Sequence, residues 1–291
     1  MSSVKIITDS NSGILQKEAE ELGIIVVPMP FYINEDEYFE ELTISQQKFY
    51  ELLKTDPSIN TSQPSPGALL DLWDEQLKTY DQIVYIPMSS GLSSSCSNAI
   101  NLAKDYNGKV QVVDNSRISV TLRESVYEAI KLAKTNKTAE EIKSYLEQTK
   151  KISSIYIMLD TLKYLKRGGR ISPAAAALGS MLKIKPILTS RGGKFEKFAM
   201  ALTPAQGKRK IIVQLKKDLE TDFAKEYADG KMVVSVAHTN NEVEANKFKE
   251  EILKEFPNLT FNFVNPLSLS VSCHIGPGAI AAALSINNYL K

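Results

Sequence analysis

Hydroxyl side chains gather in three segments of this sequence, and each segment follows or ends a stretch typical of a β-strand. The segments are Thr8–Gly13 (TDSNSG), Asn60–Gly67 (NTSQPSPG) and Met88–Ser95 (MSSGLSSS). Ligands of parallel sheets usually bind at the carboxyl ends of the strands. Hydroxyls and free N–H groups at a helix start bind carboxylate or phosphate oxygens. The segments therefore predict an anion site, although each could also be a capped turn that only starts a helix.

Two further segments carry a histidine or a cluster of cations. His274 lies in Cys273–Gly278 (CHIGPG), at the predicted entrance of a final Gly/Ala-rich helix, and small neighbours allow close backbone approach. Lys163–Arg170 (KYLKRGGR) is typical of a basic helix end followed by a tight turn. A lone histidine can equally be a structural donor, and His238 at the end of a predicted strand favours a capping role.

Composition excludes several classes of protein. The 291 residues carry a net charge of +1, so no overall field attracts nucleic acid or an anionic membrane. Cys96 and Cys273 are far apart, and no Cys/His spacing predicts a zinc site or any other metal centre. The amino-terminal residues show no secretory signal, and no apolar stretch reaches the length needed to cross a bilayer. We therefore expect a cytoplasmic protein.

The elements that must position these residues alternate between β-rich runs and amphipathic stretches, which predicts the α/β class. Residues 24–33 form one of the β-rich runs, and residues 122–135 are typical of a helix that covers a sheet. Residues 184–200 predict two strands around a Gly-Gly turn, and residues 207–226 predict one helix. A predicted helix ends near residue 150 and a different residue pattern follows it. We therefore expect one α/β domain over 1–152 and a second over 153–291.

The sequence as a whole resembles the DegV family, the bacterial fatty-acid-binding proteins that include the FakB subunits of fatty acid kinase. The similarity covers nearly the whole chain and rests on motifs in a fixed order. They are Ile6-Thr8-Asp9-Ser10, Val26-Val27-Pro28, Thr61-Ser62-Gln63-Pro64-Ser65, Ser89-Ser90-Gly91-Leu92-Ser93, Leu165–Ile171 (LKRGGRI), Ile184–Leu188 (IKPIL) and His274–Gly278 (HIGPG).

The resemblance implies two α/β domains of the DegV type with one long-chain fatty acid, such as palmitate, in a tunnel between them. Carried over by position, Thr61 and Ser93 hold the carboxylate, and Ser62 and His274 lie in the supporting network. The amino-terminal domain would then carry the anchoring loops, and the carboxyl-terminal domain the acyl-chain wall and any partner contacts. The family implies no catalytic residue and no cofactor. Where a dihydroxyacetone-kinase-like fatty acid kinase is present, it makes acyl phosphate from the presented acid and ATP.

Two departures from the family pattern affect these expectations. The family commonly continues its serine loop as Gly-Thr-Tyr, whereas this chain has Ser94-Ser95-Cys96, which changes the loop that would set acyl preference. FakB-type members carry an arginine-rich segment that is thought to meet the kinase. The corresponding residues here, Thr203–Lys210, retain one arginine, Arg209. The resemblance therefore supports fatty-acid binding more strongly than kinase partnership.

An acyl chain needs an apolar wall, for which small side chains leave room. The expected wall comprises Ala279, Ile280, Ala282, Ala283 and Leu284 on the predicted final helix, with Ile171, Ala174–Ala177, Leu178 and Met181. Close packing between helices would equally explain why these side chains are small and apolar. Membrane contact is expected to be transient at most, during lipid exchange.

Two other functions compete with fatty-acid binding. A serine hydrolase would use Ser93 as nucleophile, His274 as base and Asp9 or Asp114 as the orienting acid, but the serine segment lacks the second glycine of a nucleophile elbow. A phosphosugar- or nucleotide-binding role would use the Gly/Ser loops, yet the chain has neither a Walker lysine motif nor a GxGxxG fingerprint after a strand.

Overall fold

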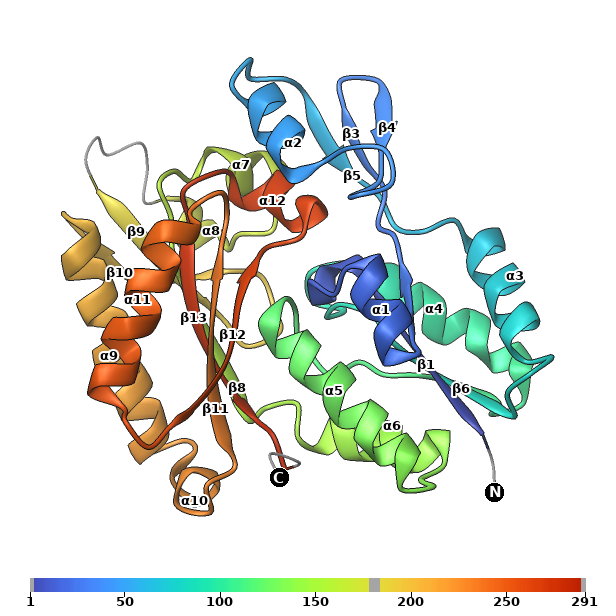
Figure 1. The fold of residues 1–291 in the computed structure, drawn as a ribbon. Helices are drawn as coiled ribbons and strands as arrows, with labels where there is room; N and C mark the ends of the chain where they lie inside the picture. Colours follow the sequence, from blue (N-terminus) through green and yellow to red (C-terminus); the bar gives the residue numbers. More distant parts are fainter. Residues whose placement is uncertain (1–2, 178–183, 289–291) are drawn as a thin grey trace. The chain divides into compact units, whose positions relative to one another are not determined.

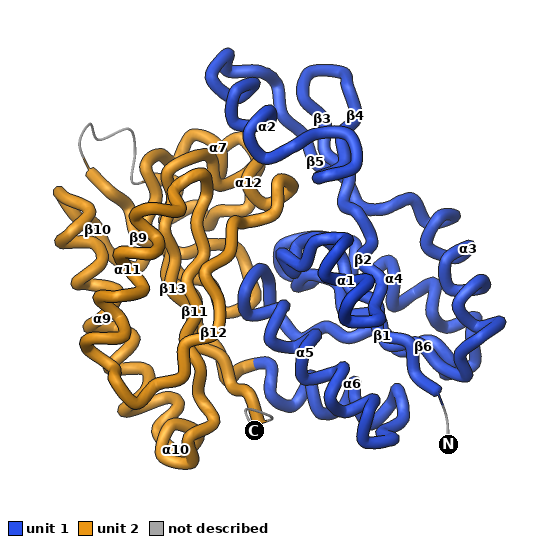
Figure 2. Tube along the Cα trace, viewed as in Figure 1, with its two compact units in different colours: residues 1–150 blue, residues 151–291 orange. Residues whose placement is uncertain are grey.

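The chain divides into two compact units, Met1–Lys150 and Lys151–Lys291, which Figure 2 shows in different colours. The computed structural model describes residues 3–177 and 184–288. Both units combine sheets with helices, which confirms the α/β class (Figure 1).

Unit 1 is built on a parallel sheet in the order β2-β1-β6-β7. Its strands are β1 (Val4–Asp9), β2 (Ile25–Val27), β6 (Gln82–Ile86) and β7 (Val110–Val112). Its helices are η1 (Ser10–Ser12), α1 (Gln16–Leu22), α2 (Gln46–Leu53), α3 (Pro66–Gln76), α4 (Ser95–Ala103), η2 (Lys104–Tyr106), α5 (Val120–Lys134) and α6 (Ala139–Gln148). Because β1 and β6 are parallel neighbours, the loops after them emerge at the same sheet edge.

The β-rich run of residues 24–33 forms two strands that belong to different sheets. Pro28 and Pro30 separate β2 from β3 (Phe31–Ile33), and β3 belongs to a second, antiparallel sheet. That sheet has the order β4-β3-β5, with β4 at Asp36–Tyr38 and β5 at Ile59–Thr61. Proline cannot donate to a strand ladder, so the chain leaves the first sheet at these residues.

Unit 2 contains a mixed sheet in the order β10-β9-β8-β13-β11-β12, in which the β11–β12 pair is parallel and the other described pairs are antiparallel. Its strands are β8 (Ser153–Met158), β9 (Lys185–Ser190), β10 (Glu196–Ala201), β11 (Met232–His238), β12 (Thr260–Pro266) and β13 (Ile280–Ile286). Its described helices are α7 (Lys163–Gly168), α8 (Pro173–Ala176), α9 (Pro204–Glu220), α10 (Ala224–Ala228), α11 (Glu242–Glu255) and α12 (Leu269–Ile275). The predicted pair of strands around a Gly-Gly turn is confirmed as β9 and β10.

Two predicted helices of unit 2 differ in the structure. The helix predicted over 207–226 starts earlier and is divided into α9 and α10. The predicted final helix is the strand β13, which lies between β8 and β11 with all seven residues buried. Alanine favours helices in isolation, but a central strand covered on both faces also accepts small apolar residues.

The expected acyl-chain wall is therefore not one helix face. Helices α9 and α11 cover one face of the sheet, where Ala282 and Leu284 belong to a core cluster with Ile211 and Phe248. Ala283 points to the opposite face, because successive strand residues alternate. Of the other expected wall residues, Ile171 is buried, Ala174–Ala176 lie in the short α8, and Leu178 and Met181 fall outside the described residues.

Candidate functional site

The carboxyl end of β1 in unit 1 carries a buried acid, Asp9. One carboxylate oxygen accepts the N–H of Asn11 at 2.9 Å, and the other accepts the N–H of Met88 at 2.9 Å. Met88 opens the serine loop (Met88–Ser95), so Asp9 joins the loops that follow two neighbouring strands. Burial is the largest influence on Asp9 and raises its pKa to about 6, although the N–H donors oppose that rise.

The serine loop is held mainly by backbone and hydroxyl contacts. The Ser89 N–H donates to the Arg117 carbonyl at 2.9 Å, and the Ser89 carbonyl accepts the N–H of Ser93 at 3.2 Å. The Ser90 hydroxyl donates to Asp114 Oδ2 at 2.5 Å. These bonds fix the path of the loop into α4.

Two serine hydroxyls at the start of α4 retain hydrogen-bonding capacity. Ser93 Oγ accepts the Ser95 N–H at 3.2 Å, and among the described residues no acceptor takes the Ser93 hydroxyl proton. Ser95 Oγ is buried, and it too has no hydrogen-bond partner in that part of the chain. A buried hydroxyl without a partner is costly, and an anion at this helix start would accept hydrogen bonds from such groups. Ser95 belongs to the hydroxyl-rich segment predicted from the sequence, but it was not singled out there as a carboxylate contact.

The NTSQPSPG segment is tied to the same helix. Thr61 ends β5, where it pairs with Phe31, and α3 begins at Pro66 after the two prolines. The Gln63 side-chain oxygen accepts the Asn98 side-chain amide at 2.6 Å. Because Asn98 belongs to α4, this bond connects the segment of Thr61 and Ser62 to the helix that follows Ser93. The sequence did not indicate this connection, since it depends on two exposed amides 35 positions apart.

Two buried arginines of unit 1 are engaged by its own groups. Arg117 donates to Ser125 Oγ at 2.9 Å and to the Thr149 carbonyl at 3.1 Å, and it lies 4.0 Å from Glu128. Arg123 donates to the Gly13 carbonyl at 3.0 Å and pairs with Glu18. Both side chains therefore connect segments of unit 1 to one another.

His274 lies in unit 2, whereas Thr61, Ser62 and Ser93 lie in unit 1. The prediction that His274 starts the last helix is wrong, because it occupies the last turn of α12. A Cβ atom at Gly168 would be 1.9 Å from His274 Nδ1, so only glycine allows this approach of α7 to α12. Burial first, and then the charge of Arg170, lower the pKa of His274 to about 4. The imidazole is therefore neutral at neutral pH.

Two local predictions for unit 2 are confirmed. Helix α7 ends at Gly168, and Gly169 adopts a left-handed conformation with φ of 69°, as a helix-ending turn requires. His238 ends β11, and its Nδ1 accepts the Asn241 N–H at 3.3 Å just before α11.

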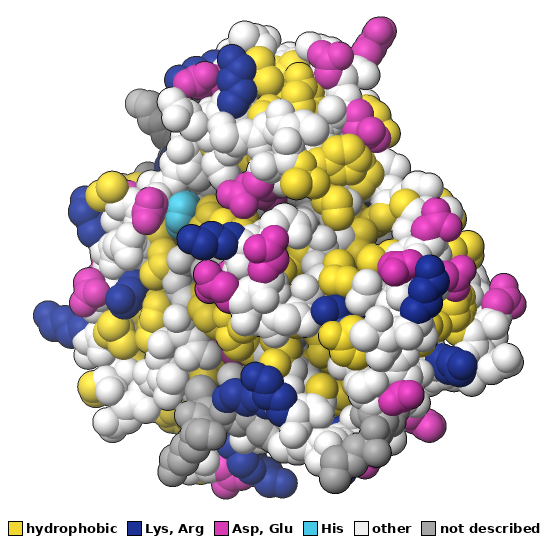
Figure 3. Space-filling model, turned by 45° about the vertical axis from the view of Figure 1, so that its right-hand side comes forward, with side chains coloured by type: hydrophobic (Ala, Val, Ile, Leu, Met, Phe, Trp, Pro, Cys, Tyr) yellow, Lys and Arg dark blue, Asp and Glu magenta, His cyan; other side chains and the backbone are white. Residues whose placement is uncertain are grey.

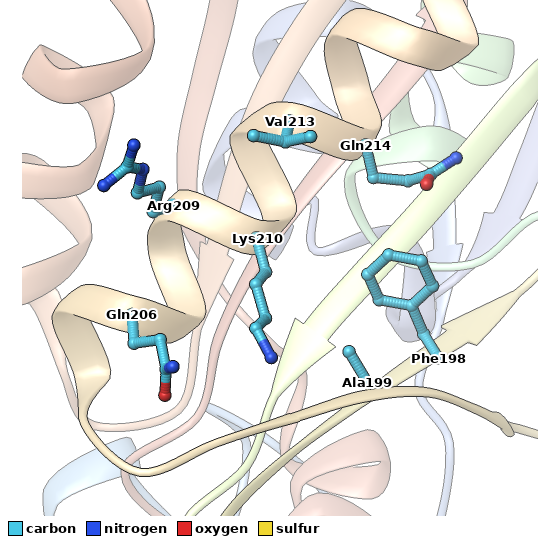
Figure 4. A pocket seen from close by; sticks show the side chains of 7 residues that line it. All are labelled: Phe198, Ala199, Gln206, Arg209, Lys210, Val213 and Gln214. Carbon is cyan, nitrogen blue, oxygen red and sulfur yellow. The ribbon is translucent and has the colours of Figure 1, made fainter.

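A pocket of about 440 Å³ lies between β10 and the first half of α9 (Figure 4). Its lining is Phe198, Ala199, Gln206, Arg209, Lys210, Val213 and Gln214. Arg209 reaches away from the strand, whereas Lys210 points toward it and donates to the Met200 carbonyl at 2.7 Å (Figure 4). The pocket thus combines an apolar floor with a cationic rim, and it contains the arginine singled out in the sequence.

The arrangement does not resemble a hydrolase centre. Asp9 binds backbone N–H groups rather than a histidine, and Asp114 accepts the Ser90 hydroxyl.

Within residues 3–177 and 184–288, no group of three or more His, Cys, Asp or Glu side chains is placed to hold a metal ion. Helices in those same ranges all lack the length and apolar character required to cross a membrane. Both signs of charge are interspersed on the face shown in Figure 3.

The fold and this site define a two-unit α/β protein with a hydroxyl-rich loop at the carboxyl ends of its parallel strands. A family model described as "Uncharacterised protein, DegV family" matches residues 3–287. The chain belongs to the DegV family.

Known proteins agree with this assignment. Protein DegV of Bacillus subtilis is 33% identical over 289 residues, which span 95% of this chain and 97% of that protein. The crystal structure of Bacillus subtilis DegV, described as a fatty acid binding protein, has 30% identity and a TM-score of 0.84 over 98% of this chain and 100% of that one. A DegV family protein from Thermus thermophilus, described by its fatty acid binding, has 25% identity and a TM-score of 0.87 with the same coverage.

Proposed function

We propose that this protein binds a long-chain fatty acid without covalent chemistry and holds its carboxylate at the serine loop. The observation that carries the proposal is the pair of hydroxyls at the start of α4: within the described residues, the Ser93 proton has no acceptor and Ser95 Oγ has no partner. Thr61 and Ser62 belong to the segment that Gln63 ties to this helix, and they complete the anchor. The fatty acid binding described for the relatives from Bacillus subtilis and Thermus thermophilus supports the same ligand class.

The energetics of the two ends of a fatty acid fit this arrangement. Each buried methylene contributes about 0.8 kcal/mol, so about fourteen of them contribute roughly 11 kcal/mol before ordering costs. An ionised carboxylate loses its hydration on burial and needs donors to replace it. Hydroxyls and helix N–H groups supply those donors without a permanent charge. The chain then drives binding, and the anchor fixes its orientation.

For the acyl chain, we propose the sheet face of unit 2 that α9 and α11 do not cover. Ala237, Ala281 and Ile157 form one cross-strand row on that face, since directly paired residues share a side of a sheet. Small side chains in such a row leave space that a polymethylene chain can fill. This assignment replaces the helical wall expected from the sequence.

We further propose that the bound acid is presented to a dihydroxyacetone-kinase-like fatty acid kinase, which forms the acyl phosphate. In this scheme the protein is not itself a catalyst, and it contributes substrate binding and orientation. The pocket beside α9 fits a partner surface, because Arg209 offers a cation next to the exposed apolar side chain of Val213. His274 remains neutral at neutral pH and belongs to the network that orients the acid.

Lipid analysis tests the first proposal. Protein purified from cells that contain fatty acids should carry about one fatty acid per chain, as native mass spectrometry and extraction would measure. Thr61→Ala and Ser93→Ala should each weaken rebinding after delipidation by about 1–3 kcal/mol, the cost of leaving a buried acceptor short of a donor. Ser97→Ala is the matched control, because its hydroxyl already donates to the Ser94 carbonyl. Lipid-free protein, or unchanged rebinding in both variants, would contradict the carboxylate anchor.

A reconstituted kinase assay tests the second proposal. Arg209→Ala should reduce acyl-phosphate formation and leave fatty-acid affinity unchanged, because Arg209 lies at the α9 pocket and not at the serine loop. His274→Ala should likewise reduce acyl-phosphate formation more than affinity. Equal turnover by wild type and both variants would remove the support for these partner and orienting roles.

A further inference from the structure

A buried acid without a counter-ion is bound to the serine loop. Asp9 is 0% exposed, and its two carboxylate oxygens accept the N–H groups of Asn11 and Met88. Among the described residues it forms no ion pair, and the buried arginines Arg117 and Arg123 bind other segments of unit 1. Neutral donors alone stabilise this charge, so its ionisation is sensitive to any further charge nearby.

The charge of Asp9 acts on the first turn of α4. Cys96 belongs to that turn and directly follows Ser95. Burial, followed by the charges of Asp114 and Asp9, raises the pKa of the Cys96 thiol to about 12. The buried Ser95 hydroxyl, which has no partner within the described residues, lies in the same turn. An anion bound at this turn therefore lies within the electrostatic range of Asp9.

Other titratable groups on the elements around Asp9 keep their protons at neutral pH. On β6, burial first and then the charge of Asp9 raise the pKa of Tyr85 well above its ordinary value. On α4, the raised pKa of Cys96 likewise keeps the thiol protonated. The short elements β2 and η1 contain no titratable side chain.

The charged groups of the neighbouring helices and loop are bound elsewhere. Burial lowers the pKa of Arg117, and the charges of Glu128 and Glu124 on α5 oppose that change. In the loop after β7, the half-buried Asp114 accepts a serine hydroxyl, and Glu147 of α6 accepts its N–H. Of all these groups, the acid at the end of β1 is the buried one whose charge changes near neutral pH.

A ligand carboxylate at the start of α4 brings a second negative charge into this site. Two like charges that are shielded from water disfavour each other's ionisation. Burial already raises the pKa of Asp9 to about 6, and a nearby anion raises it further. Protonation of Asp9 removes the repulsion, while the serine hydroxyls and helix N–H groups still donate to the ligand.

We propose that Asp9 takes up a proton when a fatty-acid carboxylate binds at the start of α4, so that the acid and the proton bind and leave together. This inference rests on the proposed function, because it requires the carboxylate to bind at the serine loop. The bound form then holds the Asp9 proton more tightly than the free form does. Affinity is therefore highest below about pH 6 and falls as the pH rises.

Calorimetric titration with laurate, a shorter and more soluble saturated fatty acid, tests the inference. Titrations at about pH 6.5 in buffers of different ionisation enthalpy measure the protons taken up per bound ligand. If the anion raises the pKa of Asp9 by about one unit, delipidated wild type should take up about half a proton per laurate. Asp9→Asn should take up almost none. Asp114→Asn is the matched control, because it removes a half-buried acid that contacts the same loop, and its proton uptake should equal that of wild type.

The pH dependence of binding gives a second readout. Laurate should bind wild type about fivefold more weakly at about pH 8 than at about pH 6, whereas Asp9→Asn should show no such change. A third readout needs only the wild-type protein. The carbon NMR signal of the Asp9 carboxyl should titrate with a midpoint about one pH unit higher when laurate is bound. This midpoint decides the question if Asp9→Asn does not bind laurate.

The outcomes separate this inference from the proposed function. If laurate binds wild type without proton uptake and without a change in the Asp9 midpoint, the inference is refuted and fatty-acid binding stands. If Asp9→Asn takes up as many protons as wild type, the proton goes to the ligand or to another group, and the inference is also refuted. If wild type binds neither laurate nor palmitate, the proposed function itself fails.

Discussion

Replacing Asp9 with asparagine tests how the acid at the end of β1 shapes the serine loop. The carboxyl group is buried, and its pKa rises from 3.8 to about 6 in the folded chain. The folded protein therefore holds the Asp9 proton more tightly than the unfolded chain does. The associated stabilisation is complete below pH 3.8 and is lost as the pH rises through about 6. The difference between these pKa values corresponds to about 3 kcal/mol.

Asparagine cannot ionise, so the Asp9→Asn variant should keep this stabilisation at neutral pH. The free energy of unfolding of the variant minus that of wild type should rise by about 2.4 kcal/mol between about pH 4 and about pH 7, because part of the total change lies outside that range. Urea unfolding of both proteins across that range measures the difference. A constant difference would refute the reasoning, because it would mean that Asp9 ionises without a penalty.

The same substitution should weaken fatty-acid binding by about tenfold. Asparagine offers one acceptor oxygen where the carboxylate offers two, so the N–H of Met88 or of Asn11 loses its partner and the loop entry loosens. Asp81→Asn is a control for which the stability relative to wild type should change with pH in the opposite direction. Hydrogen bonds from Ser3 lower the pKa of Asp81, so the stability of that variant relative to wild type should fall as the pH rises.

Three further outcomes are expected. Gly168→Ala should lower the free energy of unfolding by about 1–3 kcal/mol because of overlap with His274, and adding His274→Ala should restore part of it; no restoration in chemical unfolding would contradict the contact. Gln63→Ala and Asn98→Ala should be coupled by about 0.5 kcal/mol in a double-mutant cycle, while strictly additive effects would mean that their bond is not formed in solution. Burial raises the pKa of the Cys96 thiol to about 12, so iodoacetamide should label it only after unfolding, and rapid labelling of the native protein would show that it is exposed.

Much of the fold and part of the candidate site could be predicted because their signals are local. Helix α6 begins at Ala139, directly after the N-cap residue Thr138, whose hydroxyl forms a capping box with the Glu141 carboxylate within one turn. The hydroxyl segments were recognised because each adjoins a strand end. The roles of Thr61, Ser93 and His274 came from the family resemblance and remain predictions. The rebinding experiments test Thr61 and Ser93, and the kinase assay tests His274.

Contacts between segments that are far apart in the sequence could not be predicted from such local patterns. Nothing near Asp9 indicates that Met88 will donate to its carboxylate, and nothing near Gln63 indicates Asn98. Such bonds exist because the parallel sheet brings together the carboxyl ends of strands that are far apart in sequence.

Some local features of this protein follow from its amino-acid order alone: the capping box that starts α6, the turn between β9 and β10, and the left-handed helix end at Gly169. Each depends on residues within one or two turns of chain. The tertiary structure, in contrast, decides that residues 280–286 form a strand. It also places Ser235 and Ser154 on opposite faces of the unit 2 sheet. This is because a strand is stabilised by its neighbours in the sheet. For β13 those neighbours are β8 and β11, whose residues lie far from it along the chain.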